Sequence, residues 1–219
     1  MFIYFVSDTI LVGMVISFNM KKTKEPASQV HKSQTLRQCA FDLFVEHGFD
    51  HVNLDQIATA AGVTKGSLYW HYKNKQELIL ASCQHYYQTW HANIQKLLAP
   101  LSNPHERLKK AIVCSVDSCI IDKRNRIFTT AIFTLMQENE AVRDSWSQFY
   151  STVREFYVGL LYAVKYADGN YSLELVRRDV DLMLEAMEGL KIRAGFEKQI
   201  VEPSERKVIT TSLLSIFKL

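Results

Sequence analysis

The chain has 219 residues, of which 47% are hydrophobic and only 8 are glycine and 4 proline. This length allows one small and one larger domain, and the scarcity of Gly and Pro, with no alternating strand pattern or Gly-rich phosphate loop, favours an all-α fold over a sheet or a nucleotide-binding fold. The net charge is +3, and the positive excess lies in residues 21–75, which contain eight Lys or Arg and five Asp or Glu. Such a local excess favours an anionic partner for this part of the chain.

The N-terminal segment differs from the rest of the chain. Its first nineteen residues are apolar with Asp8 as their single charge, and a basic run follows from Met20. A signal peptide would carry its positive charge before the apolar stretch, and polar residues interrupt a possible membrane span. We therefore expect translation to start at Met20 and residues 1–30 to form an extension, apolar and then basic. The alternative, an interaction protein tethered to a membrane through residues 1–19, is disfavoured, and a cytoplasmic location is expected.

Helical spacing of apolar residues runs through the remainder of the chain. The first helix illustrates the pattern, because Leu36, Ala40 and Phe44 share one face and Gly48 follows as a stop signal. The expected long helices cover about 31–47, 75–98, 104–121, 124–138, 141–167, 172–196 and 203–217. Two short helices between the first two of these bring the expected number to about nine.

Residues 53–78 show the pattern of two short helices, a tight turn between them and the start of a third helix. Asn53 is placed to cap the first helix with Gln56 as its reciprocal partner. Gly62 supplies the turn, since a side chain there would be crowded or strained. Thr64 is placed to cap the second helix, and a similar cap recurs at the third. This spacing predicts a helix-turn-helix.

The second helix of this pair combines lysines, hydroxyls and aromatic rings in one short segment. A core helix would not contain so many polar side chains, and a solvated helix would not carry three aromatic rings without a partner. Amines, hydroxyls and flat rings suit a surface that meets phosphates, base edges and thymine methyls. The composition therefore favours a DNA-reading helix, with an ordinary helical hairpin as the alternative.

The chain closely resembles the TetR/AcrR family of bacterial transcriptional regulators in the run GVTKGSLYWHYKNKQEL, in the preceding IATAAG and in LRQCAFDLFVEHGF further upstream. The resemblance is specific from about Ser33 to Leu80, and beyond Leu80 the family shares a helical architecture but little sequence. It implies an N-terminal three-helix DNA-binding domain over residues 31–76. A larger helical domain for ligand binding and dimerisation is expected over residues 77–219.

The resemblance also implies roles for single residues. The positions that face the major groove in the family are Lys65, Gly66, Ser67 and Tyr69. Tyr69 and Ser67 are expected to contact base edges or methyl groups, and Gly66 to allow close backbone approach. The positions that meet phosphates or brace the domain in the family are matched by Thr64, Trp70, His71, Lys73 and Lys75, and Asn53 is a further DNA-binding candidate. Lys75 and the amide end of the helix it opens favour a phosphate oxygen, whereas Leu68 and Tyr72 are expected to pack in the core.

Two of the late helices carry an apolar stripe with alternating steps of four and three residues. On the helix expected over 141–167 the stripe consists of Val142, Trp146, Phe149, Val153, Phe156, Leu160 and Ala163, and on the next helix it consists of Leu173, Val176, Val180, Met183, Met187, Leu190 and Ala194. The later helix also has a second stripe, and a helix that is apolar on two sides indicates two partners. On the helix expected from Ser172 to Phe196, the second stripe consists of Leu175, Leu182, Ala186 and Gly189. In the family the last two long helices form a four-helix bundle with a second subunit, so a homodimer through Ser172–Phe196 and Pro203–Phe217 is implied. Burial inside one chain is the alternative. A two-fold dimer requires a roughly palindromic DNA operator with half-sites about 34–36 Å apart, although wider spacings occur in the family.

The family also implies a pocket for a small-molecule effector among the middle helices. Candidate lining residues are Trp90, Cys114, Asp117, Phe128, Ile132, Met136, Tyr150 and Met183. Most of these side chains fit a plain core equally well, and an apolar or aromatic ligand is favoured. Asp117 has apolar neighbours and is a candidate anchor for a cation, but pairing with Lys110 or Arg124 at helical range is expected instead.

Other chemistries find no support in the sequence. The four cysteines, Cys39, Cys83, Cys114 and Cys119, lack the CxxC spacing of metal or redox sites. We expect no metal, no cofactor and no catalytic residues, and therefore no enzyme. The function expected is a homodimeric, ligand-responsive transcriptional regulator, most simply a repressor released from its operator by a small molecule. The alternative is a ligand-independent DNA-binding architectural or division protein of the same fold.

Overall fold

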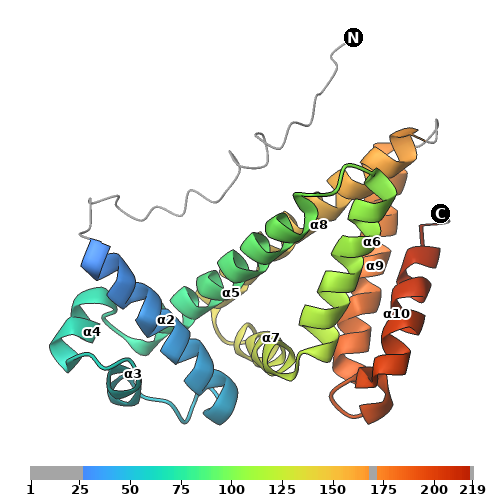
Figure 1. Ribbon diagram of the computed structural model, residues 1–219. Helices are drawn as coiled ribbons and strands as arrows, with labels where there is room; N and C mark the ends of the chain where they lie inside the picture. Colours follow the sequence, from blue (N-terminus) through green and yellow to red (C-terminus); the bar gives the residue numbers. More distant parts are fainter. Residues whose placement is uncertain (1–26, 168–171, 218–219) are drawn as a thin grey trace.

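The computed structural model describes residues 27–167 and 172–217, and these ranges are helical throughout apart from short connections (Figure 1). The α-helices are α2 (Ala27–His47), α3 (Leu54–Ala60), α4 (Lys65–His71), α5 (Lys75–Leu98), α6 (Pro104–Val116), α7 (Lys123–Leu135), α8 (Glu140–Ala167), α9 (Leu173–Arg193) and α10 (Pro203–Ser215). Within the described ranges the all-α prediction and the nine expected helices are confirmed. The expected start at Met20 lies outside the described residues.

The first three helices form a small unit around the buried face of α2. Leu36, Ala40 and Phe44 on that face are almost fully buried, as their spacing predicts. Gly48 has a φ of +81° and ends α2, and Gly62 has a φ of +65° in the turn between α3 and α4. Only glycine adopts this left-handed conformation at low cost, which explains both positions.

Helix α5 connects this small unit to the rest of the molecule. Asn74 caps it, as expected, by accepting a hydrogen bond from the Glu77 N–H at 2.9 Å. Its first turns pack against α2, and its later turns pack against α6 and α8 (Figure 1). Leu78 at one end and Ile94 and Leu98 near the other are buried. A single continuous helix therefore contributes to the cores of both parts.

The larger part is a bundle built around α8. This helix packs on α5, α6 and α9, while α10 lies against α6 and α9 (Figure 1). Six of the seven residues of the apolar stripe predicted for α8 are buried, and the last, Ala163, is exposed. The aromatic members of the stripe make ring contacts with α5. Tyr87 and Phe149 stack with centroids 4.0 Å apart and planes 3° apart, and Trp90 meets Phe149 edge-on. None of the described helices has the length and hydropathy needed to cross a membrane.

Helix α6 is shorter than expected. It ends at Val116, and residues Asp117–Ile121 form a π-helical turn, η1, closed by a 2.8 Å bond from the Asp122 N–H to the Asp117 carbonyl. The partner expected for Asp117 is also wrong, because its carboxylate forms a two-pronged ion pair with Arg206 of α10. Arg124 is out of helical range, since Asp122 interrupts the helix and caps α7.

Candidate nucleic-acid interface

The start of each short helix is fixed by its own side chains. Asn53 Oδ1 accepts a 2.9 Å hydrogen bond from the Gln56 N–H, and Gln56 Oε1 accepts a 2.8 Å bond from the Asn53 N–H. Thr64 Oγ1 accepts a 3.2 Å bond from the Ser67 N–H and so caps α4. Both predicted caps are confirmed. They hold α3 and α4 in fixed directions on either side of Gly62.

Helix α4 has one buried side and one free side. Leu68 is fully buried, and the buried Tyr72 just beyond the helix shares a 3.0 Å hydrogen bond with Ser33 of α2, so the packing predicted for both is confirmed. On the other side Tyr69 and Trp70 are 50% and 60% exposed. Two large aromatic side chains side by side in solvent are unusual on a seven-residue helix and mark a contact surface.

The predicted DNA-binding residues belong to the N-cap of α3, to the N-cap and body of α4, and to the segment from the end of α4 to the first residue of α5. Those that are exposed are Asn53, Thr64, Lys65, Gly66, Tyr69, Trp70 and Lys73, and those that are half-buried are Ser67, His71 and Lys75. An open hollow beside α4 brings together Asn53, Tyr69 and Lys75, which come from three different elements. Three of the predicted residues, one from each element, therefore border the same hollow.

Ion pairs and hydrogen bonds position the basic side chains of this surface. Lys65 Nζ donates to Asp55 Oδ2 at 2.5 Å, and this bond raises the pKa of Lys65 above its ordinary value. Lys75 Nζ lies 3.4 Å from the Asp50 carbonyl oxygen. Asp55 was not predicted from the sequence. The pair spans two helices and ten residues, for which the local sequence carries no signal.

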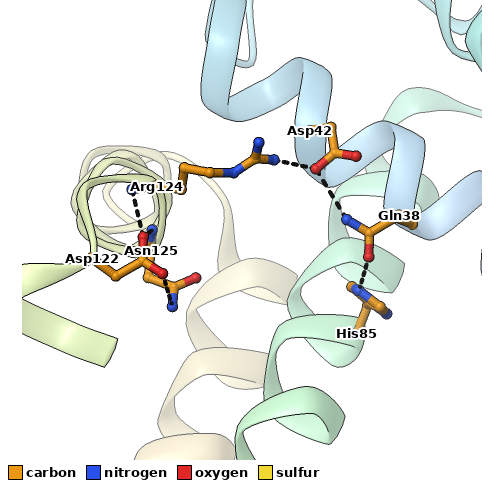
Figure 2. Close-up of polar contacts among 6 residues, drawn as sticks. All are labelled: Gln38, Asp42, His85, Asp122, Arg124 and Asn125. Carbon is orange, nitrogen blue, oxygen red and sulfur yellow. Dashed lines mark hydrogen bonds and ion pairs between the residues drawn. The ribbon is translucent and has the colours of Figure 1, made fainter. Parts of the chain in front are cut away.

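Polar contacts join the small unit to the larger part (Figure 2). Arg124 at the start of α7 forms an ion pair with Asp42 of α2. Asp42 Oδ1 also accepts a 3.0 Å hydrogen bond from Gln38, whose Oε1 lies 2.8 Å from His85 Nε2 of α5. Burial lowers the pKa of His85. Three helices are thus linked at one point, which we call the junction: Gln38, Asp42, His85 and Arg124.

An apolar layer lies against the junction. The Phe41 ring of α2 has its centroid 4.7 Å from that of Phe128 of α7 and stacks on Tyr86 of α5 at 6.5 Å. The Arg124 guanidinium lies 5.9 Å from the Phe41 centroid. Tyr86 also lines a largely enclosed cavity of about 40 Å³ inside the bundle. A continuous set of packed rings therefore runs from this cavity to α2.

The cavity contains some of the residues predicted to line a pocket. Trp90 and Tyr150 line it, and Cys114 lines a neighbouring cavity of about 70 Å³ together with Trp90. The remaining candidates do not border the cavity: Phe128, Ile132 and Met183 are buried in the core, Met136 is half-buried, and Asp117 faces α10. Lining residues that the sequence did not suggest include Trp146, Glu188 and Lys191.

Comparisons with known proteins converge on the same part of the chain. The family described as "Bacterial regulatory proteins, tetR family" matches residues 37–82. The HTH-type transcriptional regulator AcrR of Shigella flexneri is 29% identical over 118 residues, 52% of each protein. The regulator SrpR of Pseudomonas putida is 41% identical over 68 residues, 30% of this chain and 31% of its own. The chain therefore spans about half or less of these curated relatives.

The similarity of the whole fold extends further than that of the sequence. A TetR transcription regulator from Haloarcula marismortui superimposes with a TM-score of 0.73 at 14% identity, covering 86% of this chain and 97% of its own. At this identity the match establishes the fold alone. Sequence similarity is concentrated on α2–α4 and the first turns of α5, where the exposed aromatic and basic side chains lie.

Proposed function

Because the chain belongs to the TetR family, we propose that it binds double-stranded operator DNA as a homodimer and regulates transcription under the control of a small molecule. One observation carries this proposal. Helix α4 presents Tyr69 and Trp70 to solvent, its first residue, Lys65, is exposed, and Lys73, two residues beyond its end, is exposed as well. Aromatic rings and amines on a short helix that is braced from behind suit insertion into a major groove. We propose repression as the simplest mode of action.

The size of this surface and the outer side of α9 support the proposed homodimer. One seven-residue helix makes few base contacts, so a specific site requires two copies related by a two-fold axis. The outer side of α9 and its extension carries exposed apolar side chains at helical spacing: Leu175, Leu182, Ile192 and Phe196. Val208 of α10 is exposed as well. Such a stripe supports a self-complementary interface.

The junction supports control by an effector. A ligand shifts an equilibrium only as far as it prefers one arrangement of the protein. A ligand in the cavity would contact Tyr86, which packs on Phe41 of α2. Displacement of this ring would move α2 together with the α3–α4 pair. The proposed result is a changed separation of the two α4 helices in the dimer, and hence release of the operator.

The small size of the cavity also supports the second candidate, a DNA-binding protein without an effector. A volume of about 40 Å³ holds only a few water molecules. A drug-sized ligand would therefore require side chains to move. The two candidates differ in whether a ligand changes the affinity for DNA, because the DNA affinity of a ligand-independent protein would not change.

The direct test is fluorescence anisotropy of the purified protein with DNA from upstream of its own gene, at two salt concentrations. Scrambled DNA of equal length is the control. We expect binding to the native fragment to exceed binding to the control by about a hundredfold or more. Equal and strongly salt-dependent binding to both fragments would show that the protein does not recognise the sequence of the native fragment. Absence of binding to either at low salt would refute DNA binding by the free protein.

A further inference from the structure

We propose that Asp55 determines the sequence specificity of DNA binding by holding Lys65 away from phosphates until a G·C base pair binds both side chains. At that pair guanine accepts a hydrogen bond from Lys65 and cytosine donates one to Asp55. The inference rests on the proposed function, because it concerns how the helix-turn-helix distinguishes one DNA sequence from another.

The Asp55–Lys65 ion pair joins the two short helices at the end of the molecule remote from α9 and α10 (Figure 1). Asp55 lies in the first turn of α3, Lys65 is the first residue of α4, and their Oδ2 and Nζ atoms are 2.5 Å apart. The Lys65 side chain is 67% exposed and that of Asp55 is 52% exposed. The pair is therefore set on two capped helices, and its charged ends are accessible to a ligand that approaches from solvent.

Asp55 lowers the value of Lys65 as a general phosphate contact. The hydrogen bond to Asp55 raises the pKa of Lys65, so the amine stays charged, but the carboxylate balances that charge. Contacts from lysine to phosphate supply affinity that does not depend on sequence. A phosphate oxygen reaches Lys65 only by displacing Asp55, whose carboxylate then lies unpaired beside the negative DNA. Arbitrary DNA thus gains little from Lys65, as a device for specificity requires.

The surroundings of Asp55 indicate contact with bases and not with phosphates alone. Asp55 borders the hollow that also contains Asn53, Tyr69 and Lys75, and a second carboxylate, that of Asp50, lines the same hollow. Carboxylates repel phosphates, so a surface for the DNA backbone alone would not carry two of them here. The edges of bases include amino groups, from which a carboxylate accepts hydrogen bonds.

The pair presents one acceptor and one donor side by side, and a G·C base pair matches both. In the major groove guanine offers the acceptors O6 and N7, and cytosine offers the N4 amino group as a donor. Lysine with guanine and aspartate with cytosine are the favoured partners. An A·T pair places its donor on the purine and an acceptor on the pyrimidine, the reverse order. Opening the ion pair at G·C therefore leaves both Lys65 and Asp55 hydrogen-bonded.

The first test is a double-mutant cycle of Asp55→Ala and Lys65→Ala in the full chain, measured by fluorescence anisotropy on scrambled DNA at several salt concentrations. Asp55→Ala should tighten this binding about tenfold and steepen the slope of log K against log salt by about one per subunit, because each Lys65 gains a phosphate. In the Lys65→Ala background the same change should tighten binding less than about threefold. Glu106→Ala, which removes a carboxylate from the first turn of α6, is the matched control and should change nothing.

The second test uses the half-sites that the unaltered chain selects from random duplex DNA, with each G·C pair replaced in turn by A·T. We expect one G·C pair whose replacement in both half-sites weakens binding about tenfold or more. Asp55→Ala should bind the selected and the replaced duplex with nearly equal affinity. Loss of local structure would weaken binding to every duplex alike, so it would not produce this difference. Asp55→Asn, which keeps the shape of the side chain, replaces Asp55→Ala in the cycle if that variant does not fold.

Unchanged binding of scrambled DNA by Asp55→Ala would overturn the proposal, and so would an equal gain with and without Lys65. Selected half-sites in which Asp55→Ala alters the preference at an A·T pair, or at no pair, would overturn it as well. In these outcomes the unaltered chain still selects a sequence, so the proposed function stands. A chain that binds no duplex at low salt would refute both.

Discussion

Gly66 lies on the free side of α4, where a Cβ atom would meet only the Thr64 hydroxyl oxygen, at 4.0 Å. Its φ is ordinary for a helix, so Gly66→Ala should stabilise the fold by up to about 1 kcal/mol through helix propensity. The same methyl group should weaken operator binding, because it keeps the backbone away from the DNA. Gly159→Ala, in the middle of α8 with open space around its Cβ, is the matched control. Denaturant unfolding should show a higher free energy of unfolding for both variants. Fluorescence anisotropy should show weaker operator binding only for Gly66→Ala.

Tyr69 is the side chain on α4 best placed for a base contact, because it is half exposed and borders the hollow that contains Asn53 and Lys75. Tyr69→Ala should reduce the preference for the native operator by about 1–3 kcal/mol and leave binding to scrambled DNA nearly unchanged. Anisotropy on both fragments measures this difference. Tyr162→Ala, at an exposed tyrosine of α8 remote in sequence from α4, is the control. Undiminished discrimination by Tyr69→Ala would mean that another face of α4 reads the DNA.

At the scale of helices, the sequence predicted what is local and missed what is not. The caps at Asn53 and Thr64 and the glycine turn were predictable, because each depends on residues within three positions. The π-helical turn was not, since the apolar spacing of α6 continues through it to Ile121. The Asp117–Arg206 ion pair was missed because its partners lie 89 positions apart. The cavity depends on the packing of five helices, α5 to α9, and of η1, so only Trp90 and Tyr150 among its lining residues were anticipated.

The Asp42–Arg124 ion pair allows a direct test of the contact between helices α2 and α7. Both side chains are about half exposed, so solvent screening should limit their coupling energy to about 0.2–1 kcal/mol. A double-mutant cycle with Asp42→Asn and Arg124→Gln, followed by denaturant unfolding, measures this value. The exchanged pair Asp42→Arg/Arg124→Asp should recover part of the stability. Additive effects in the cycle, with no recovery in the exchanged pair, would mean that α2 and α7 are held by the Phe41 layer alone.

For the molecule as a whole, α9 has two apolar faces with different surroundings. Val180, Met183 and Met187 on the inner face are buried against the bundle, as the first predicted stripe requires. Leu182 on the outer face is 53% exposed and Phe196, beyond the end of the helix, is 69% exposed. Burial of both faces within one chain, the alternative considered from the sequence, is therefore wrong. An exposed apolar stripe of this kind is what a second copy would cover.

Leu182→Arg should accordingly convert a dimer into monomers, because it places a charge at the centre of a desolvated apolar contact. Sedimentation velocity measures the assembly state, and anisotropy on the same samples measures operator affinity. Ile127→Arg, at an exposed apolar position of α7, is the matched control and should leave the dimer intact. Since each monomer carries a single α4, its operator affinity should fall to about the level of non-specific binding. A monomeric Leu182→Arg variant with full operator affinity would mean that DNA recognition does not require the dimer. A Leu182→Arg variant that stays dimeric would mean that the interface does not include this face of α9.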